Sequence, residues 1–215
     1  MNMSEGIKWL SKNNIEVRTV LDVGASDGCW SKDCMGYFPK SNYVLFEPQP
    51  VHINSLKLFY KSNKQKINVV YKAVGSSVGT TFFDANDPFG GALSESDGIG
   101  MIKVVLTTID DTVQELKSKG PYLIKLDTHG YEKSILEGSL KTLEETNVLI
   151  IEAYNHRISN ESFLFWELCS YLENKGFRPG NIVDTLNREY DQSLWQMDIF
   201  FIKTNCEIFK YNSYK

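Results

Sequence analysis

The chain has 215 residues, of which 42% are hydrophobic and 13% aromatic, and its formal net charge is −4. These values are typical of one globular domain and exclude a disordered chain, and the mildly acidic balance gives no electrostatic reason to expect nucleic acid or an anionic membrane as a partner. The first 20 residues lack the apolar core of a signal peptide and no stretch is apolar enough to span a membrane, so we expect a soluble, cytoplasmic protein.

Strands and helices alternate from the start of the chain. The apolar run "TVLDVG" at 19–24 predicts a buried parallel strand, and "CWSKDCMGYF" at 29–38 predicts a short helix. "YVLFEP" at 43–48 predicts a second strand, 49–63 a second helix, and "INVVYKAVG" at 67–75 a third strand.

The alternation is interrupted in the middle of the chain. Residues 79–85 predict an extra strand, and residues 84–100 predict a loop rich in glycine and acids. Loops of this length inside a compact domain are usually functional or disordered. We therefore expect 84–100 to be an active-site lid, in which Phe89 and Leu93 cover a ligand and exclude water.

The remainder of the chain returns to alternating elements. It predicts helices at 110–120, 130–145 and 160–177, and strands at 101–109, 122–128, 148–154, 177–185 and 195–203. The loop between the last two strands is too short for a helical crossover, so the final strand should be antiparallel to its neighbour.

The whole pattern predicts one α/β domain over residues 1–215, a mostly parallel sheet with helices on both faces. Residues 1–18 are expected to form a helical lead-in and 205–215 a polar tail. Ligands of such sheets bind at the carboxyl ends of the strands. Four residues occupy strand ends of this kind: Gly24, Glu47, Asp127 and Glu152.

The loop "VGASDG" after the first strand allows three interpretations. A dinucleotide site requires G-x-G-x-x-G, but the second glycine is missing and Asp27 stands where phosphate would lie. S-adenosyl-L-methionine has no phosphate, so Asp22 and Asp27 could orient its ammonium group while Gly24 and Gly28 let it approach the backbone. Glu47 could then accept both ribose hydroxyls. A turn without a ligand would not predict an acid at the end of the second strand.

In this context the sequence resembles the FkbM family of S-adenosyl-L-methionine-dependent methyltransferases over residues 18–204. The resemblance rests on "VLDVGASDG", "VLFEPQP", "TTIDD", "IKLDTHGYEKSILEG", "VLIIEAY" and "WQMDIFFIK". The most specific part, "IKLDTHGYE", is similar to a family signature of Asp, two residues, Gly, any residue and Glu. The resemblance implies a Rossmann-like class I methyltransferase fold, with a seven-stranded, mostly parallel sheet and an antiparallel last strand. It also implies methyl transfer to a hydroxyl of a sugar, a glycan building block or a small secondary metabolite.

Positions matched to the family imply the cofactor site. The implied residues are Asp22, Gly24, Gly28, Glu47, Ala73 and Asp127. His129 departs from the family pattern, in which an acid or a neutral polar residue is more common. The strand end reads "DTHG" and lacks the Asp/Asn-Pro-Pro-aromatic motif typical of amine methylation, which favours oxygen as the acceptor atom.

The acceptor hydroxyl must lose a proton during methyl transfer. His129 is the candidate base, because imidazole accepts protons near neutral pH, and Asp127 is expected to hold the cofactor or the acceptor. Glu132, Glu152 and His156 are candidate acceptor contacts. The structural alternatives are a helix cap for Asp127, a surface hydrogen-bonding residue for His129 and, for Glu132, a first-turn acid favoured by the helix dipole. Asp127, His129 and Glu152 could in principle hold a divalent ion, but nothing in their spacing demands one and we expect no metal.

Three classes of function are therefore compared. The first is an O-methyltransferase for a small-molecule or saccharide acceptor, with neither nucleic acid nor membrane as partner. The second is a nicotinamide-dependent oxidoreductase, which the missing glycine and Asp27 disfavour. The third is a non-catalytic module that binds S-adenosyl-L-methionine, which the intact set of glycines and acids disfavours.

Overall fold

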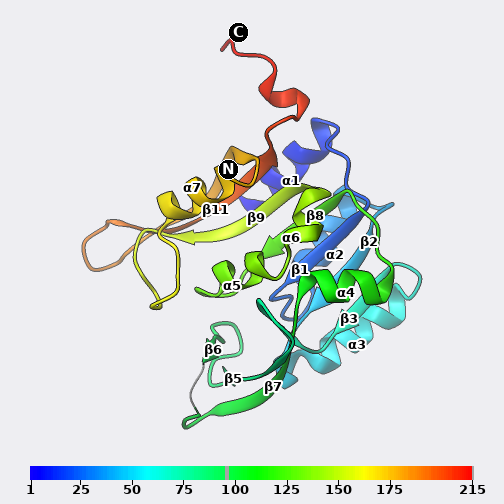
Figure 1. Ribbon diagram of the computed structural model, residues 1–215, viewed down its shortest axis with the longest axis vertical. Helices are drawn as coiled ribbons and strands as arrows, with labels where there is room; N and C mark the ends of the chain where they lie inside the picture. Colours follow the sequence, from blue (N-terminus) through cyan, green and yellow to red (C-terminus); the bar gives the residue numbers. More distant parts are fainter. Residues whose placement is uncertain (95–96, 215) are drawn as a thin grey trace.

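The computed structural model describes residues 1–94 and 97–214. A seven-stranded sheet runs through the molecule, with strand order β10-β11-β9-β8-β1-β2-β3 (Figure 1). Its strands are β1 (Thr19–Val23), β2 (Asn42–Phe46), β3 (Ile67–Val70), β8 (Tyr122–Leu126), β9 (Thr146–Tyr154), β10 (Phe177–Asn187) and β11 (Leu194–Lys203).

The strand directions confirm the predicted sheet. β1, β2, β3, β8 and β9 are parallel, whereas β11 pairs antiparallel with both β9 and β10. Only residues 188–193 connect β10 to β11, so the chain reverses within the sheet and cannot cross over it. The fold is that of a class I methyltransferase.

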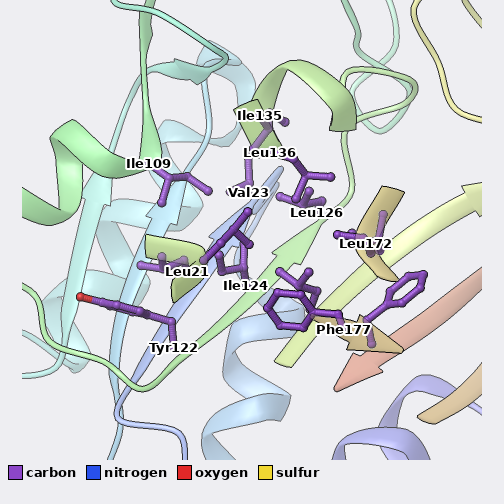
Figure 2. Packing of buried hydrophobic residues seen from close by; sticks show 14 of the residues in the cluster. Leu21, Val23, Ile109, Tyr122, Ile124, Leu126, Ile135, Leu136, Leu172 and Phe177 are labelled. Atoms are coloured by element: carbon purple, nitrogen blue, oxygen red, sulfur yellow. The ribbon is translucent and has the colours of Figure 1, made fainter. Parts of the chain in front are cut away.

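Helices cover both faces of this sheet. They are α1 (Met3–Lys12), α2 (Cys29–Tyr37), α3 (Ile53–Ser62), α4 (Ile109–Leu116), α5 (Glu132–Glu137), α6 (Leu140–Glu144) and α7 (Phe165–Glu173), with the short 3-10 helices η1 (Pro50–His52) and η2 (Glu207–Phe209). Side chains alternate along a strand, so Val20 packs with α1, α2 and α3 on one face and Leu21 with α4 to α7 on the other. Figure 2 shows the second core, in which Ile109, Ile135 and Leu172 pack on one face of the sheet.

The strand register brings the predicted strand ends together. Val23 of β1 pairs with Phe46 of β2 and with Leu126 of β8, and Leu126 pairs with Ile151 of β9. The residues that follow, namely Gly24, Glu47, Asp127 and Glu152, therefore share one edge of the sheet.

A second sheet departs from the prediction. It contains β4 (Ala73–Val74), β5 (Gly79–Asp84), β6 (Leu93–Ser94) and β7 (Met101–Thr107), in the order β4-β7-β5-β6. The predicted third strand therefore divides into β3 and β4, and the strand predicted at 101–109 lies outside the central sheet. The pattern of β7 agrees with this position, because Val104 and Leu106 are buried while Val105 is 48% exposed, as in a sheet with one solvated face.

The helix predicted over 130–145 is broken into α5 and α6 near Gly138. A Cβ atom at Gly138 would lie 2.0 Å from the carbonyl oxygen of Gly75, so only glycine allows this approach of the two chain segments. Asp110 of α4 then accepts hydrogen bonds from the backbone N–H groups of Lys141 and Thr142 at the start of α6.

Each of the two segments that flank the sheet contains a helix. The lead-in contains α1, which buries Ile7 and Leu10, and the tail contains η2. The predicted lid at 84–100 includes β6, and its residues 95 and 96 lie outside the described residues. Within the described part of the chain, every helix is too short or too polar to cross a membrane.

Candidate active site

The loop after β1 requires glycine at two points. Gly24 and Gly28 have φ values of +81° and +86°, in the left-handed region. A Cβ atom at Gly24 would lie 2.1 Å from the carbonyl oxygen of Asp127, so this glycine lets the loop approach the end of β8. At Gly28, a Cβ atom would lie 2.8 Å from the Phe59 ring, so this second glycine allows α2 to pack against α3.

Glu47 follows β2 and closes the other side of the same loop. It is 5% exposed, and its two carboxylate oxygens accept backbone N–H groups from Ser26 at 2.7 Å and Gln49 at 2.8 Å. Burial raises the pKa of Glu47, and these two hydrogen bonds oppose that rise. The carboxylate is thus fixed in place and keeps lone pairs for further donors.

A cavity of about 310 Å³ lies above this edge of the sheet, between the glycine loop and the predicted lid. Its size lies at the lower end of the range of small-molecule sites, about 300–1,000 Å³. It brings together six residues singled out from the sequence: Gly24, Asp27, Glu47, Ala73, Asp127 and His129. Five other predicted site residues do not line it: Asp22, Gly28, Glu132, Glu152 and His156.

Asp22 lies beneath the cavity and has no exposed surface. Its Oδ2 accepts a hydrogen bond from Ser31 at 2.7 Å. Its Oδ1 has no hydrogen-bond partner among the residues that the structure describes, and it lies 3.9 Å from Nζ of Lys125. Burial raises the pKa of Asp22, and Lys125 opposes this. This placement offers no direct contact with a ligand and instead supports Lys125 from below.

Lys125 is a residue that the sequence interpretation missed, because it lies inside the apolar strand "YLIKL". Its buried ammonium group is 2.9 Å from Oδ2 of Asp127 and 5.4 Å from the centre of the Trp30 ring. Burial lowers the pKa of Lys125, but the carboxylates of Asp127 and Asp22 outweigh it and raise that pKa. Conversely, burial raises the pKa of Asp127 while Lys125 lowers it, with a net decrease. The pair therefore stays charged and fixes the Asp127 carboxylate.

His129 follows at a φ of 50°, which is uncommon for a residue with a side chain. Its Nδ1 is 3.3 Å from the carbonyl oxygen of Gly91 in the predicted lid. Because a carbonyl can only accept, Nδ1 carries the proton and Nε2 has the lone pair in the neutral imidazole. Nε2 lies 3.8 Å from Oδ1 of Asp127 and 3.7 Å from Oε2 of Glu152.

Glu152 forms the third member of this group. Its carboxylate accepts hydrogen bonds from the side chains of Tyr154 and Gln196. Burial and the nearby charge of Asp127 raise its pKa. Asp198, opposite Glu152 in β11, was not singled out from the sequence, and burial raises its pKa to about 7. Carboxylates thus accumulate at the ends of β8, β9 and β11.

Glu132 and His156 lie close to this group without entering the cavity. Glu132 is buried, and its carboxylate accepts the backbone N–H of Gly130 and the hydroxyl of Thr128, both at 3.0 Å. It therefore braces the loop that carries His129. The His156 ring stacks on Trp195 with centroids 5.3 Å apart, and its Nε2 is buried without a hydrogen-bond partner in the described part of the chain.

The predicted lid is attached on both sides of the cavity. After β2, Gln49 donates to the carbonyl of Asp87 at 3.0 Å, and Nε2 of His52 lies 2.7 Å from the carbonyl oxygen of Pro88. On the other side, the carbonyl of Gly91 accepts the imidazole N–H described above. The described part of this loop therefore spans the cavity from β2 to β8.

Two apolar residues of the loop contribute to the cavity wall, as expected for a lid. Leu93 is half-buried there, and Phe89 lines the cavity although 71% of its surface is exposed. The Phe89 ring also contacts His52, with ring centroids 5.7 Å apart.

Together, the sheet order, the glycine loop with an acid beside it and the acid after β2 define a class I, S-adenosyl-L-methionine-dependent methyltransferase. The family profile described as "Methyltransferase FkbM domain" matches residues 22–179, and the chain belongs to this family. Membership confirms the predicted family and the predicted cofactor, and it decides against the oxidoreductase alternative.

Solved structures show the same fold. FkbM from Methylobacillus flagellatus KT has a TM-score of 0.56 at 19% identity, over 85% of this chain and 43% of that chain. Sp1610 from Streptococcus pneumoniae, solved with S-adenosyl-L-methionine, has a TM-score of 0.53 at 14% identity, over 94% of this chain and 73% of that chain. Precorrin-6y C5,15-methyltransferase from Geobacter metallireducens GS-15 has a TM-score of 0.51 at 11% identity, over 93% of this chain and 86% of that chain. The chain thus spans less than half of its Methylobacillus relative, and no curated protein matches it.

The groups that line the cavity are complementary to S-adenosyl-L-methionine, the methyl donor of this family. The close approach at Gly24 leaves backbone, without a side chain, at the end of β1. Glu47 is a buried acceptor that would suit a ribose diol, and Phe46, Ala73 and Val74 form an apolar wall that would suit a purine.

Proposed function

We propose that the protein is an O-methyltransferase that transfers the methyl group of S-adenosyl-L-methionine to a hydroxyl of a sugar, a glycan building block or a small secondary metabolite. The observation that carries this proposal is the convergence of Asp127 and His129, which line the cavity, with Glu152 next to them. Carboxylates and an imidazole lone pair accept hydrogen bonds from hydroxyl groups, and they repel the phosphates of a nucleic acid.

The cofactor would occupy the side of the cavity formed by β1 and β2. Gly24 and Gly28 shape the loop, Glu47 accepts the ribose hydroxyls, and Ala73 contacts the adenine. Asp127 forms the boundary of the cofactor site on the side of β8. When bound, the cofactor supplies an electrophilic methyl group on a positive sulfur, and the carboxylates nearby favour that charge.

The acceptor would approach from the β8–β9 side. Glu152 is the contact that the geometry supports best, because its carboxylate is held by two side chains and remains 11% exposed. His156, stacked on Trp195, would form a more distant contact. Glu132 would act indirectly, through the loop that it braces.

His129 and Asp127 are the proposed catalytic residues, because both line the cavity at its acceptor end. The acceptor hydroxyl can lose its proton there in two ways. Nε2 of His129 can take the proton directly, or Nε2 and the two carboxylates can hold a cation that makes a bound hydroxyl more acidic. Removal of metal should leave turnover unchanged if the first route operates and should abolish it if the second does.

Three further features belong to this proposal. Residues 1–215 act as one methyltransferase domain, with 1–18 as lead-in and 205–215 as tail. The loop at 84–100 acts as a lid that keeps water from the reacting groups. The reaction takes place in the cytoplasm, which agrees with four free cysteines, since a reducing compartment keeps thiols unpaired.

The test is a methyl-transfer assay on a panel of monosaccharides, glycosides, polyols, hydroxylated small metabolites, amines and transfer RNA. We expect release of S-adenosylhomocysteine with a hydroxylated acceptor only, and a product whose mass and NMR spectrum show a methoxy group. His129→Gln should reduce turnover by about 10²-fold or more. Glu161→Gln, at a residue whose side chain is 74% exposed, should leave it unchanged. An N-methylated product or methylated RNA would overturn the proposal.

A further inference from the structure

We propose that Asp127, His129 and Glu152 bind a divalent metal ion of the Mn²⁺ type at the acceptor end of the cavity. The role of the ion in catalysis rests on the proposed function, since it would hold the hydroxyl that receives the methyl group. Binding of the ion does not depend on that function and can be measured without cofactor or acceptor.

The three side chains supply ligand atoms from separate points of the fold. Asp127 and His129 follow β8, Glu152 lies in β9, and their ligand atoms all lie within 4.8 Å of one another. Bonds from a divalent ion to nitrogen or oxygen are about 2.0–2.2 Å long, so ligands of one ion lie roughly 3.0–3.6 Å apart at angles of 90–120°. The distances of 3.7 and 3.8 Å from Nε2 to the carboxylate oxygens need only a small contraction to fit.

The same distances are too long for hydrogen bonds. At 3.7 and 3.8 Å they lie beyond the limit of about 3.5 Å between nitrogen and oxygen, whereas Nδ1 of His129 lies 3.3 Å from the Gly91 carbonyl oxygen and donates to it. Nε2 of His129 therefore faces two carboxylate oxygens without a hydrogen bond to either. Histidine ligands of metals commonly donate their other ring N–H to a backbone carbonyl in this way.

Surrounding groups hold the carboxylates in position for an ion. Oδ2 of Asp127 is fixed by Lys125, which leaves Oδ1 facing His129. Tyr154 and Gln196 hold the carboxylate of Glu152. Such outer partners orient the ligands of metal sites and strengthen binding.

The charge at this edge of the sheet also favours a cation. The Lys125 ammonium is shared between Asp127 at 2.9 Å and the buried Asp22 at 3.9 Å. Glu152 and Asp198, which face each other across β9 and β11, add further carboxylates on the same side. A divalent ion would offset this excess of negative charge.

The ligand set indicates the kind of ion. Carboxylates suit Mg²⁺, Ca²⁺ and Mn²⁺, whereas imidazole suits transition metals, so one imidazole with two carboxylates favours Mn²⁺. Three protein ligands leave positions for water and for an acceptor oxygen. A hydroxyl bound to the ion loses its proton more readily, which gives the second of the two routes to methyl transfer. His129 then acts as a ligand.

The experiment is a titration of the cofactor-free protein with MnCl₂, followed by the electron paramagnetic resonance signal of free Mn²⁺. We expect one site in the wild type, and binding at least tenfold weaker in Glu152→Gln and in His129→Gln. Glu47→Gln is the matched control, because it removes a buried carboxylate on the other side of the cavity and should keep Mn²⁺ affinity within twofold. Circular dichroism verifies that each variant is folded.

Two outcomes would overturn the metal site: a free Mn²⁺ signal unchanged by the wild type up to about 1 mM, where even weak sites fill, or equal affinity in the wild type and Glu152→Gln. S-adenosylhomocysteine binding, measured by calorimetry on the same samples, separates the two proposals. If the wild type binds S-adenosylhomocysteine but not Mn²⁺, only the metal site is rejected. If the wild type does not bind S-adenosylhomocysteine, the methyltransferase proposal is rejected.

Discussion

The two sides of the cavity are built by different means. On the β1–β2 side, Glu47 is held by backbone N–H groups, and Gly24 permits a close approach of two backbone segments. On the β8–β9 side, side chains hold side chains: Lys125 fixes Asp127, and Tyr154 and Gln196 hold Glu152. The first side depends on backbone groups, and the second on contacts between side chains.

This difference agrees with the roles proposed for the two sides. A nucleoside is the same in every turnover of this class of enzyme, so a rigid backbone loop suits it. Acceptors differ between enzymes, and side chains can vary without altering the sheet. The predictions below test whether the sides are separable, in order of decreasing effect.

The largest effect is expected from removing the cation that the buried carboxylates share. Lys125→Met leaves Asp22, which is fully buried, without its ion-pair partner, and should reduce the free energy of unfolding by about 3–5 kcal/mol at pH 7. Burial already raises the pKa of Asp22. The loss of unfolding free energy should therefore diminish as the pH falls through that raised pKa, because the carboxyl group then takes up a proton. Urea unfolding at several pH values measures this.

Lys133→Met is the matched control for that variant. Lys133 pairs with Glu161 at 3.5 Å, but both side chains are largely exposed, so the change should cost less than about 0.5 kcal/mol. Equal destabilisation by the two substitutions would show that the buried position of Lys125 has no special importance.

A second prediction concerns the backbone of the β1–β2 side. Gly24→Ala places a Cβ atom 2.1 Å from the Asp127 carbonyl oxygen at a positive φ, so the loop must move. We expect S-adenosylhomocysteine affinity to fall about 100-fold, or 2.7 kcal/mol, by calorimetry. Gly36→Ala is the control, because no described atom outside the backbone of α2 and the neighbouring residues lies within 4 Å of the added Cβ. This variant should keep that affinity and gain about 0.5–1 kcal/mol of stability. Unchanged affinity in Gly24→Ala would contradict the loop's role.

A smaller effect follows from the raised pKa of Glu47. Burial makes this carboxyl group take up a proton at a higher pH than an ordinary glutamate. Once protonated it accepts ribose hydroxyls less well, so S-adenosylhomocysteine affinity should decline with falling pH, beginning above about pH 4.3, and by up to tenfold per unit below the pKa. The affinity of Glu47→Gln should vary less with pH; identical profiles would exclude Glu47 as the cause.

The sequence predicted the central sheet and the β1–β2 side because both follow local patterns. A strand that ends in glycine or an acid is visible in consecutive residues, and the sheet then aligns those ends. It did not predict the second sheet, since β4 and β6 have only two residues each, nor the break at Gly138, which depends on the approach of Gly75.

On the β8–β9 side, the sequence predicted the acids as site residues but not the side chains around them. Lys125 and Asp198 were not predicted, because each is a polar residue inside a largely apolar strand. Asp22 and Glu132 were predicted as ligand contacts, but their side chains are buried and bonded to other protein groups. A strand or helix pattern does not show whether a carboxylate faces a cavity or the protein interior. Side-chain networks of this kind require the tertiary structure.

The most direct test of the two-sided cavity is calorimetric titration of S-adenosylhomocysteine into the wild type, Glu47→Gln and Glu152→Gln. Glu47→Gln should lose at least tenfold in affinity, because a charged acceptor of hydrogen bonds contributes about 1.5–3 kcal/mol. Glu152→Gln should bind within threefold of the wild type. Equal losses in both variants, or full affinity in Glu47→Gln, would show that the cofactor is not held by the β1–β2 side as described here.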